Sequence, residues 1–281
     1  MVWFWGCEEM KLSIITVNLN NAEGLRRTIE SVISQTFIDF EYIVIDGGST
    51  DGSVDIIKQY ADKIAYWVSE PDKGIYNAMN KGIVRAKGEY CLFLNSGDWL
   101  CAEVVLEKVF KIASSDDILY CDLKIVKEHA VIIEHIYPDY LTFKYLFCST
   151  VCHQSVLIKR ALFNKYGMYN EKNKIVSDWE FFIIVLSKYN VTYMHLPIFL
   201  SYFDGSGMSS IMENSDLIKF ERKTVLEKEF PFFYDDYLFF EKNEILKEEL
   251  YSIKKSKAYR LGKFLLKPLY GLKNIYNFIT K

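Results

Sequence analysis

The sequence predicts an α/β protein whose sheet is mostly parallel and flanked by helices. Two observations support this prediction. Short apolar runs alternate with segments of helical spacing over residues 12–68, and the apolar runs end in polar turns. Runs of this kind are typical of strands buried on both faces, which are joined by crossover helices. Half of the 281 residues are hydrophobic and 16% are aromatic, so a sizeable core can form.

The first half of the chain supplies the alternation in order. The expected elements are the strand 12–17, the helix 25–33, the strand 40–46, the helix 54–60, the strand 64–68, a loop entering a short helix over 69–83, and the strand 90–94. The helix at 25–33 follows from apolar side chains spaced three and four apart, with charged residues between them. Strand, helix and strand at these intervals indicate parallel pairing.

The pattern changes in the second half of the chain. Here we expect the helix 104–113, the strands 118–121, 130–135 and 156–159, and the helices 161–166 and 181–186. Residues 201–210 are rich in Gly and Ser and are equally compatible with an active-site lid or an ordinary connector. After residue 211 the chain is expected to form helices, many of them charged.

Both ends of the chain differ from the body. Residues 1–9 show no periodicity and Met10 is a candidate start, so residues 1–10 are expected to form a leader outside the fold. Residues 251–281 contain eight Lys and Arg and no Asp or Glu. The segment 254–281 also carries Leu, Ile, Phe and Tyr, which suits either an anchor on an anionic membrane or a helix packed on the acidic body. Pro268 interrupts it under both interpretations.

Charge and cysteine usage exclude several classes of protein. A net charge of −3 disfavours a nucleic-acid partner. The six cysteines contain no CxxC pair, and Cys148, Cys152 and His153 lack a second ligand pair at zinc spacing, so reduced thiols are expected. No apolar run approaches the ~20 residues of a spanning helix, and the N-terminus lacks a basic signal region. We therefore expect a cytoplasmic protein.

One carboxylate follows the most apolar strand of the chain. Residues 90–94 end in the polar turn Asn95-Ser-Gly-Asp98. In open α/β sheets, ligands bind beyond the carboxyl ends of the strands. If a divalent ion and a phosphate meet there, Asp98 is the natural oxygen ligand. The alternative is a simple loop between two apolar segments.

The second strand also ends in a carboxylate. Asp46 is followed by Gly-Gly-Ser-Thr-Asp-Gly-Ser, which leads into a helix. This loop is either a glycine-rich connection with Asp51 or Ser53 as helix cap, or a ligand site in which Asp46 accepts hydrogen bonds from a base or a ribose. The first strand is not followed by GxGxxG, so a dinucleotide site is disfavoured.

Four segments in this order resemble a known family. They are Thr16-Val-Asn-Leu-Asn, the loop that begins at Asp46, Ser69-Glu-Pro-Asp-Lys-Gly-Ile-Tyr-Asn-Ala-Met-Asn-Lys-Gly-Ile, and Leu94-Asn-Ser-Gly-Asp98. Together they resemble family 2 glycosyltransferases of the GT-A fold, a Rossmann-like sheet, and in particular the polysaccharide branch typified by colanic acid enzymes. The resemblance covers residues 11–210, with a nucleotide-sugar half at 11–100, an acceptor half at 101–210 and a helical extension at 211–281.

The resemblance implies a nucleotide-sugar donor, with a UDP-sugar expected, a divalent Mg²⁺ or Mn²⁺, and transfer with inversion. By position it implies that Asp46 contacts the base and that Asp98 holds the metal. Thr16 and Asn18 would line the nucleotide pocket, and Asp72 and Lys73 would lie near the ribose and diphosphate. The chain departs from the common DxD motif because Asn95, on the donor side, replaces the first carboxylate. Metal affinity without donor is therefore expected to be weak.

The second half holds the residues expected to face the acceptor. In the family that this chain resembles, the carboxylate at Asp178 is the catalytic base, and Glu180 ranks second here because it points to another side of the helix. A sugar hydroxyl needs such a base to become a good nucleophile. Asp178 also suits a simple helix cap. His153 and Gln154 fit the acceptor side, although His153 is equally compatible with a hydrogen-bonded structural role.

The sequence therefore predicts a metal-dependent inverting glycosyltransferase that builds a cell-surface glycan, with an acceptor that is a glycan or a lipid-linked glycan. It is expected at the inner face of the cell membrane. The alternatives are a catalytically inactive, membrane-associated partner in glycan assembly, favoured by Asn95, and a sugar nucleotidyltransferase. The latter is disfavoured because no basic, glycine-rich phosphate loop follows the first strand.

Overall fold

The computed structural model describes residues 10–127, 131–189, 191–205, 214–261 and 263. The chain divides into two compact units, Met1–Val225 and Leu226–Lys281. The expected leader at residues 1–9 and most of the basic tail lie outside the described residues.

The first half of the larger unit is a parallel α/β array, as predicted. Its elements are β1 (Leu12–Asn18), α1 (Ala22–Ile33), β2 (Phe40–Asp46), α2 (Ser53–Gln59), the 3₁₀ turn η1 (Ala61–Lys63), β3 (Tyr66–Ser69), α3 (Ile75–Arg85) and β4 (Tyr90–Phe93). β1 pairs in parallel with β2 on one side and with β4 on the other, and β2 pairs in parallel with β3. The parallel strands and crossover helices expected from the sequence pattern are therefore confirmed.

The second half extends the same sheet with mixed pairing. It contains β5 (Trp99–Leu100), α4 (Val105–Ile112), β6 (Ile118–Lys127), β7 (Val131–His135), α5 (Phe143–Cys148), the 3₁₀ turn η3 (His153–Ser155), β8 (Val156–Lys159), α6 (Arg160–Tyr166), α7 (Ser177–Lys188) and β9 (Tyr193–Asp204). The strand order is β3-β2-β1-β4-β8-β6-β9-β5, and β7 pairs with β6 outside this path. β8 runs antiparallel between β4 and β6, whereas β6 and β9 are parallel.

β9 corrects one expectation. Residues 201–204 belong to this strand rather than to a Gly/Ser loop, because β9 pairs with β6 as far as Asp204 and with β5 at Ser201 and Tyr202. The rest of the expected loop, residues 206–213, lies outside the described residues. Asp204 is therefore the last residue of β9.

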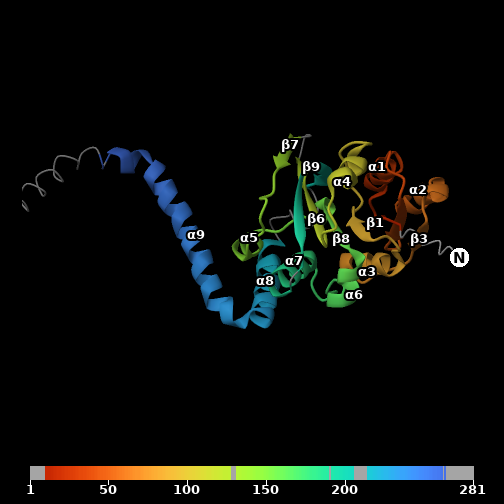
Figure 1. Ribbon diagram of the computed structural model, residues 1–281. Helices are drawn as coiled ribbons and strands as arrows, with labels where there is room; N and C mark the ends of the chain where they lie inside the picture. The colour runs from red at the N-terminus through yellow and green to blue at the C-terminus, as the bar shows by residue number, and fades with distance from the viewer. Residues whose placement is uncertain (1–9, 128–130, 190, 206–213, 262, 264–281) are drawn as a thin grey trace, which may run out of the picture. The chain divides into compact units, whose positions relative to one another are not determined.

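Both faces of the sheet are buried, which explains the apolar runs in the sequence. Alternate residues of one strand enter different cores: Ile15 and Phe93 lie in one cluster, and Ile14 and Leu92 in the other. Helices α1, α2 and α4 cover one face, and α3, α6 and α7 cover the other (Figure 1). A sheet enclosed in this way exposes only its strand ends, so the loops beyond those ends are where a ligand can bind.

α8 (Ser215–Glu229) runs across the boundary between the two units, and the 3₁₀ turn η6 (Pro231–Phe233) and α9 (Tyr234–Lys255) follow. α9 is a long helix on which several large apolar side chains, including Phe239 and Leu246, are exposed. Within the part of the chain that the structure describes, no helix has the length and apolar character needed to cross a bilayer.

Candidate functional site

The carboxyl ends of the parallel strands form one polar edge. In register, Asn18 at the end of β1 lies beside Asp46 at the end of β2, and Asp46 lies beside Ser69 at the end of β3. The side-chain amide of Asn18 donates to Asp46 over 2.7 Å, and the Ser69 hydroxyl donates to it over 2.6 Å. The polar turns that the sequence placed after each strand therefore meet at one edge.

Asp46 is fully buried and its carboxylate organises the loop that follows β2. Besides Asn18 and Ser69, it accepts hydrogen bonds from the backbone N–H of Gly48 and from both the N–H and the hydroxyl of Ser49. Burial opposes ionisation, but the hydrogen bonds from Ser49, Ser69 and Asn18 hold the pKa of Asp46 below its usual value. Five donors saturate the roughly four lone-pair sites of a carboxylate, so Asp46 holds the loop after β2 in place.

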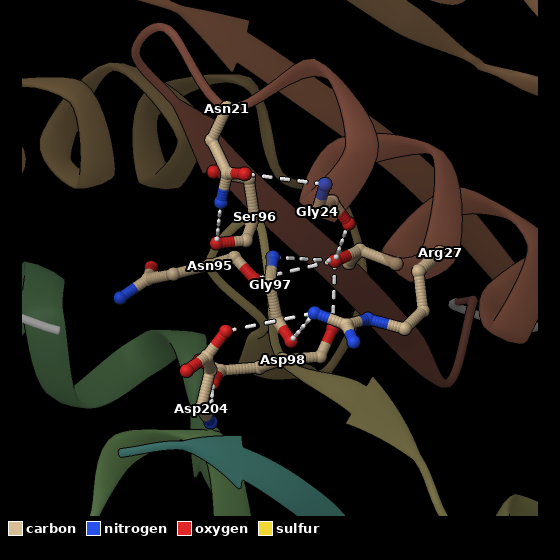
Figure 2. Close-up of polar contacts among 9 residues, drawn as sticks. Asn21, Gly24, Arg27, Asn95, Ser96, Gly97, Asp98 and Asp204 are labelled. Carbon is tan, nitrogen blue, oxygen red and sulfur yellow. Dashed lines mark hydrogen bonds and ion pairs between the residues drawn. The ribbon is translucent and has the colours of Figure 1, made fainter. Parts of the chain in front are cut away.

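The turn after β4 is fastened to α1 (Figure 2). Gly97, which adopts a φ of 108° that favours glycine, donates its N–H to the Thr28 hydroxyl, and that hydroxyl donates to the carbonyl of Asp98 over 2.7 Å. The Asn21 amide and the Arg27 guanidinium donate to carbonyls of the same turn. These contacts with α1 fix the backbone of the turn at Asp98. An ordinary surface loop without such contacts would be mobile.

A second carboxylate lies beside Asp98. The backbone N–H of Asp204 donates to Asp98 Oδ1 over 2.9 Å, and the Asp204 carboxylate lies 3.5 Å from the guanidinium of Arg27. Arg27 in turn stacks on Trp99 at 4.2 Å. Asp98 is 4% exposed; burial raises its pKa to about 7, and the nearby charge of Asp204 acts in the same direction. A buried carboxylate next to a second one is an environment that favours a cation.

These residues fit a divalent ion in the chemistry of their donors. Asp98 and Asp204 supply hard carboxylate oxygens, and the buried Asn95 Oδ1 has no hydrogen-bond partner among the described residues. Across the same described residues, no group of three or more His, Cys, Asp or Glu is arranged to hold a metal. Two carboxylates supply only part of the coordination shell of a divalent ion, and oxygens of the substrate would have to complete it.

Asp178 sits in the first turn of α7 with both carboxylate oxygens occupied. Oδ1 accepts from the Tyr76 hydroxyl at 3.0 Å and from the Trp179 N–H at 2.9 Å, and Oδ2 lies 2.9 Å from His153 Nδ1. Burial opposes ionisation, but the hydrogen bond and charge of His153 outweigh it and lower the pKa of Asp178. For His153, burial opposes charging while Asp178 raises the pKa above its usual value. Asp178 is therefore ionised at neutral pH.

The segment before α7 is held from a distant part of the chain. Glu221 on α8 is 5% exposed and accepts from the backbone N–H groups of Lys174, Ile175 and Val176 at 2.7, 3.1 and 3.3 Å. One carboxylate that accepts from three consecutive backbone N–H groups fixes the segment leading into α7. Nothing in the sequence indicates this role, because Glu221 looks like any charged residue of a solvated helix.

These groups face a common cavity of about 630 Å³. Of the residues singled out from the sequence, six line it: Asn18, Asp72, Asn95, Asp98, His153 and Asp178. The cavity is also lined by Tyr76, Lys174 and Asp204, none of which was predicted from the sequence as a site residue. For Asp204, the available signal was a carboxylate at the end of an apolar run, the same signal that identified Asp46 and Asp98.

The remaining five lie outside the cavity wall formed by the described residues: Thr16, Asp46, Lys73, Gln154 and Glu180. Thr16 is buried and hydrogen-bonded to the Tyr42 hydroxyl at 3.0 Å, and Gln154 is buried, with its backbone carbonyl accepting from the Ser201 hydroxyl. Glu180 accepts from the amides of Asn170 and Asn173, on another side of α7 from Asp178. Lys73 is exposed.

The fold resembles that of solved glycosyltransferases. Staphylococcus aureus TarS 1–349 in complex with UDP-GlcNAc superposes with a TM-score of 0.61 at 20% identity, over 79% of this chain and 68% of that one. The mannosyltransferase PcManGT from Pyrobaculum calidifontis, in complex with GDP-Man and Mn²⁺, gives 0.54 at 13% identity, over 96% and 88%. Identities this low show a shared fold, that of the GT-A glycosyltransferases.

Sequence comparison assigns the family. Residues 13–178 match the model of glycosyl transferase family 2, and the chain belongs to that family. A PGL/p-HBAD biosynthesis glycosyltransferase of Mycobacterium bovis is 31% identical over 215 residues, which are 74% of this chain and 82% of the relative. An uncharacterized glycosyltransferase of Rickettsia typhi is 29% identical over 195 residues, 66% and 61% of the two chains. The enzyme class expected from the sequence is thus confirmed.

Proposed function

We propose that this glycosyltransferase moves a sugar from a nucleotide-sugar donor to a hydroxyl of a growing cell-surface glycan, with inversion at the anomeric carbon. The observation that supports this most is that two carboxylates, the buried Asp98 and the largely buried Asp178, lie on the wall of one cavity. They come from different parts of the chain, Asp98 from the turn after β4 and Asp178 from the first turn of α7. The first would serve the leaving diphosphate, and the second the attacking hydroxyl.

The donor would enter along the edge formed by β1 and β2. Asn18, Asp72 and Asn95 line the cavity there with amide and carboxylate groups that suit a base, a ribose and a diphosphate. Gly47 allows close approach of the two loops, since a Cβ at this position would lie only 2.5 Å from Asp72 Oδ2. The structures of TarS and PcManGT contain UDP-GlcNAc and GDP-Man, respectively, and support a nucleotide-sugar donor, with a UDP-sugar as the expected form.

Asp98 and Asp204 would hold a Mg²⁺ or Mn²⁺ ion, with the diphosphate oxygens of the donor completing its shell. Such an ion stabilises negative charge on the departing nucleoside diphosphate. Arg27 keeps the Asp204 carboxylate next to the turn, and Thr28 fixes the backbone of Asp98. Because the protein contributes only two carboxylates, metal affinity is expected to depend on the donor.

Asp178 would act as the general base. Its carboxylate is ionised and held at three points, so it can accept the proton of an acceptor hydroxyl without first changing its own orientation. The hydroxyl oxygen then attacks the anomeric carbon from the face opposite the leaving diphosphate. Attack from that face gives the inverted configuration in the product.

The donor class is tested by thermal shift. Each of UDP, UDP-GlcNAc, UDP-glucose and GDP-mannose is titrated with and without Mn²⁺. We expect stabilisation by the uridine nucleotides that is several-fold stronger in Mn²⁺, because nucleotide and metal complete each other's binding site. An equal response to Mn²⁺ alone, or a response to guanosine and not uridine nucleotides, would contradict the proposed donor site.

The acceptor is proposed to be a glycan on a lipid carrier, met at the cytoplasmic face of the membrane. The tail supports this: the segment after Ser252 carries all eight cations of residues 251–281, and Lys254 and Lys255 lie at the end of α9. Each cation near an anionic surface contributes about 1 kcal/mol. The alternative, an inactive partner in glycan assembly, gives no turnover of any donor in the assay below.

The tail prediction is tested by co-sedimentation with vesicles. The full chain is expected to bind anionic vesicles at low salt, to dissociate as salt approaches 1 M, where the Debye length is only ~3 Å, and to ignore neutral vesicles. A chain ending at Ser252 should lose this binding. Equal binding by both chains would place the contact elsewhere in the protein.

A further inference from the structure

The general base proposed above is connected to the turn that carries Asp98. Asp178 Oδ2 lies 2.9 Å from His153 Nδ1, and His153 Nε2 lies 2.9 Å from Asn95 Nδ2. The carbonyl of Asn95 accepts from the N–H of Asp98 at 2.9 Å. Three contacts thus link α7, η3 and the turn after β4, which come from widely separated parts of the sequence.

The ring orientation of His153 follows from its partners. An ionised carboxylate only accepts hydrogen bonds, so Nδ1 carries the hydrogen toward Asp178 whether the ring is neutral or charged. The side chains of His153 and Asp178 are each 14% exposed, so few waters compete for this contact. The hydrogen bond consequently fixes one oxygen of Asp178 while Tyr76 and Trp179 fix the other.

An amide is suited to the position of Asn95. Toward a neutral His153 ring, the Asn95 nitrogen donates to Nε2; toward a charged ring, the Asn95 oxygen can accept from it after rotation of the amide. An ionised carboxylate only accepts hydrogen bonds, so at this position it could bind only the charged His153 ring, whose Nε2 carries a hydrogen. In the structure, the amide nitrogen lies next to the ring and Oδ1 is buried without a partner. Asn95 can therefore hold the ring in both protonation states.

We propose that His153, held in place by Asn95, is a positioning residue that aims the Asp178 carboxylate at the acceptor hydroxyl. The inference depends on the proposed role of Asp178 as the base. It also explains why this chain has an amide where the common motif has its first carboxylate. Asn95 therefore contributes a hydrogen bond to His153, and through it to the base Asp178, where the common motif contributes a second metal ligand.

The surroundings of Asp178 make this role measurable by pH. Among the described residues, Asp178 interacts with the titratable side chains of Tyr76 on α3, Cys152 before η3, His153 in η3 and Tyr169 after α6, and Lys174 lines the same cavity. Burial raises the pKa of Cys152 to about 11 and that of both tyrosines well above 10, so all three stay neutral in the assay range. Asp98 also faces His153 and favours its charged form. Loss of His153 should therefore shift the acid limb of the kcat profile.

The test compares three substitutions of His153 in the full chain. In the variant His153→Asn, the amide nitrogen takes the place of Nδ1 and can still donate to Asp178. In His153→Gln it takes the place of Nε2 and leaves Asp178 without this donor, as does His153→Ala. We expect His153→Gln and His153→Ala to lose about tenfold or more in kcat, while KM for the donor changes less than about threefold. His153→Asn should keep most of the turnover.

The pH profile separates positioning from simple structural support. In His153→Gln, the acid limb of kcat should move to higher pH, because burial of Asp178 is no longer offset by its main hydrogen bond. A structural role would lower the melting temperature and reduce kcat equally at every pH. Equal activity of the Asn and Gln variants, or an unmoved acid limb, would overturn the proposal.

The background variant Asp178→Asn distinguishes this proposal from the function itself. If Asp178 is the base and His153 acts through it, His153→Gln should reduce kcat no further in that background. An inactive Asp178→Asn with a fully active His153→Gln would overturn the positioning role and leave the function standing. Full turnover by Asp178→Asn would instead remove the base assignment on which the positioning role depends.

Discussion

Replacement of Asp98 by asparagine is expected to abolish transfer, with turnover reduced on the order of a thousandfold or more, the scale of a metal ion that stabilises several kcal/mol of charge. The physical reason is that Asp98 is the carboxylate fixed most firmly at the donor end of the cavity, with its backbone held by Thr28 and one oxygen held by the Asp204 N–H. Asparagine keeps the shape and the oxygen that accepts this hydrogen bond, but it lacks the negative charge.

The same variant should leave the fold intact. Burial of a neutral amide costs less free energy than burial of a carboxylate, so the melting temperature of the metal-free Asp98→Asn protein should be no lower than that of the parent. The readouts are turnover, Mn²⁺-enhanced binding of UDP and the melting temperature.

Asp204→Asn should weaken Mn²⁺ binding less than Asp98→Asn, because the Asp204 carboxylate is partly exposed and paired with Arg27. Asp55→Asn, an exposed carboxylate on α2, is the control for loss of charge alone. Full activity of Asp98→Asn would remove the central element of the proposed donor site.

The parallel half of the fold was predictable because its evidence is local. β1, β2 and β4 are short apolar runs that end in polar turns, and strands buried on both faces require that pattern whatever surrounds them. Asp46 and Asp98 were identified by the same rule, since the ends of parallel strands meet at one edge of the sheet, whereas Asn18 was indicated only by the family resemblance. The pattern does not say which of these ends face the cavity. Only the structure shows that Asp46 is surrounded by five donors from its own chain.

The residues that the sequence did not reveal act through long-range contacts. Tyr76 reaches Asp178 across about a hundred positions of sequence, and Glu221 holds the segment before α7 from a helix that carries no motif. Asp204 was assigned to a loop because Gly205 and the Ser residues after it resemble a connector, whereas pairing with β6 extends the strand to this residue. Neither composition nor spacing encodes such contacts, because they arise only when the two halves of the sheet join.

Asp178→Asn is expected to reduce kcat about a hundredfold or more while leaving donor affinity nearly unchanged, as general-base catalysis requires. Among the described residues, the Asp178 carboxylate makes its hydrogen bonds to Tyr76, Trp179 and His153, which follow neither β1 nor β2, so its replacement should not disturb the nucleotide. An asparagine at this position can still accept from Tyr76 or the Trp179 N–H, which limits any structural change. The measurements are kcat and KM for the donor, with the binding of UDP and Mn²⁺ as a readout that needs no turnover.

The matched control is Glu180→Gln, two residues further along α7. Glu180 is also a buried acid in the first turn of this helix, so its replacement removes a similar charge from the same helix terminus. Its carboxylate accepts from Asn170 and Asn173, away from His153, and we expect only a modest loss of kcat. If Glu180→Gln is the crippling change and Asp178→Asn keeps its turnover, the base lies on the other side of α7. The hydrogen bonds of Asp178 to His153 and Tyr76 would then serve to hold the helix to the sheet and would have no part in proton transfer.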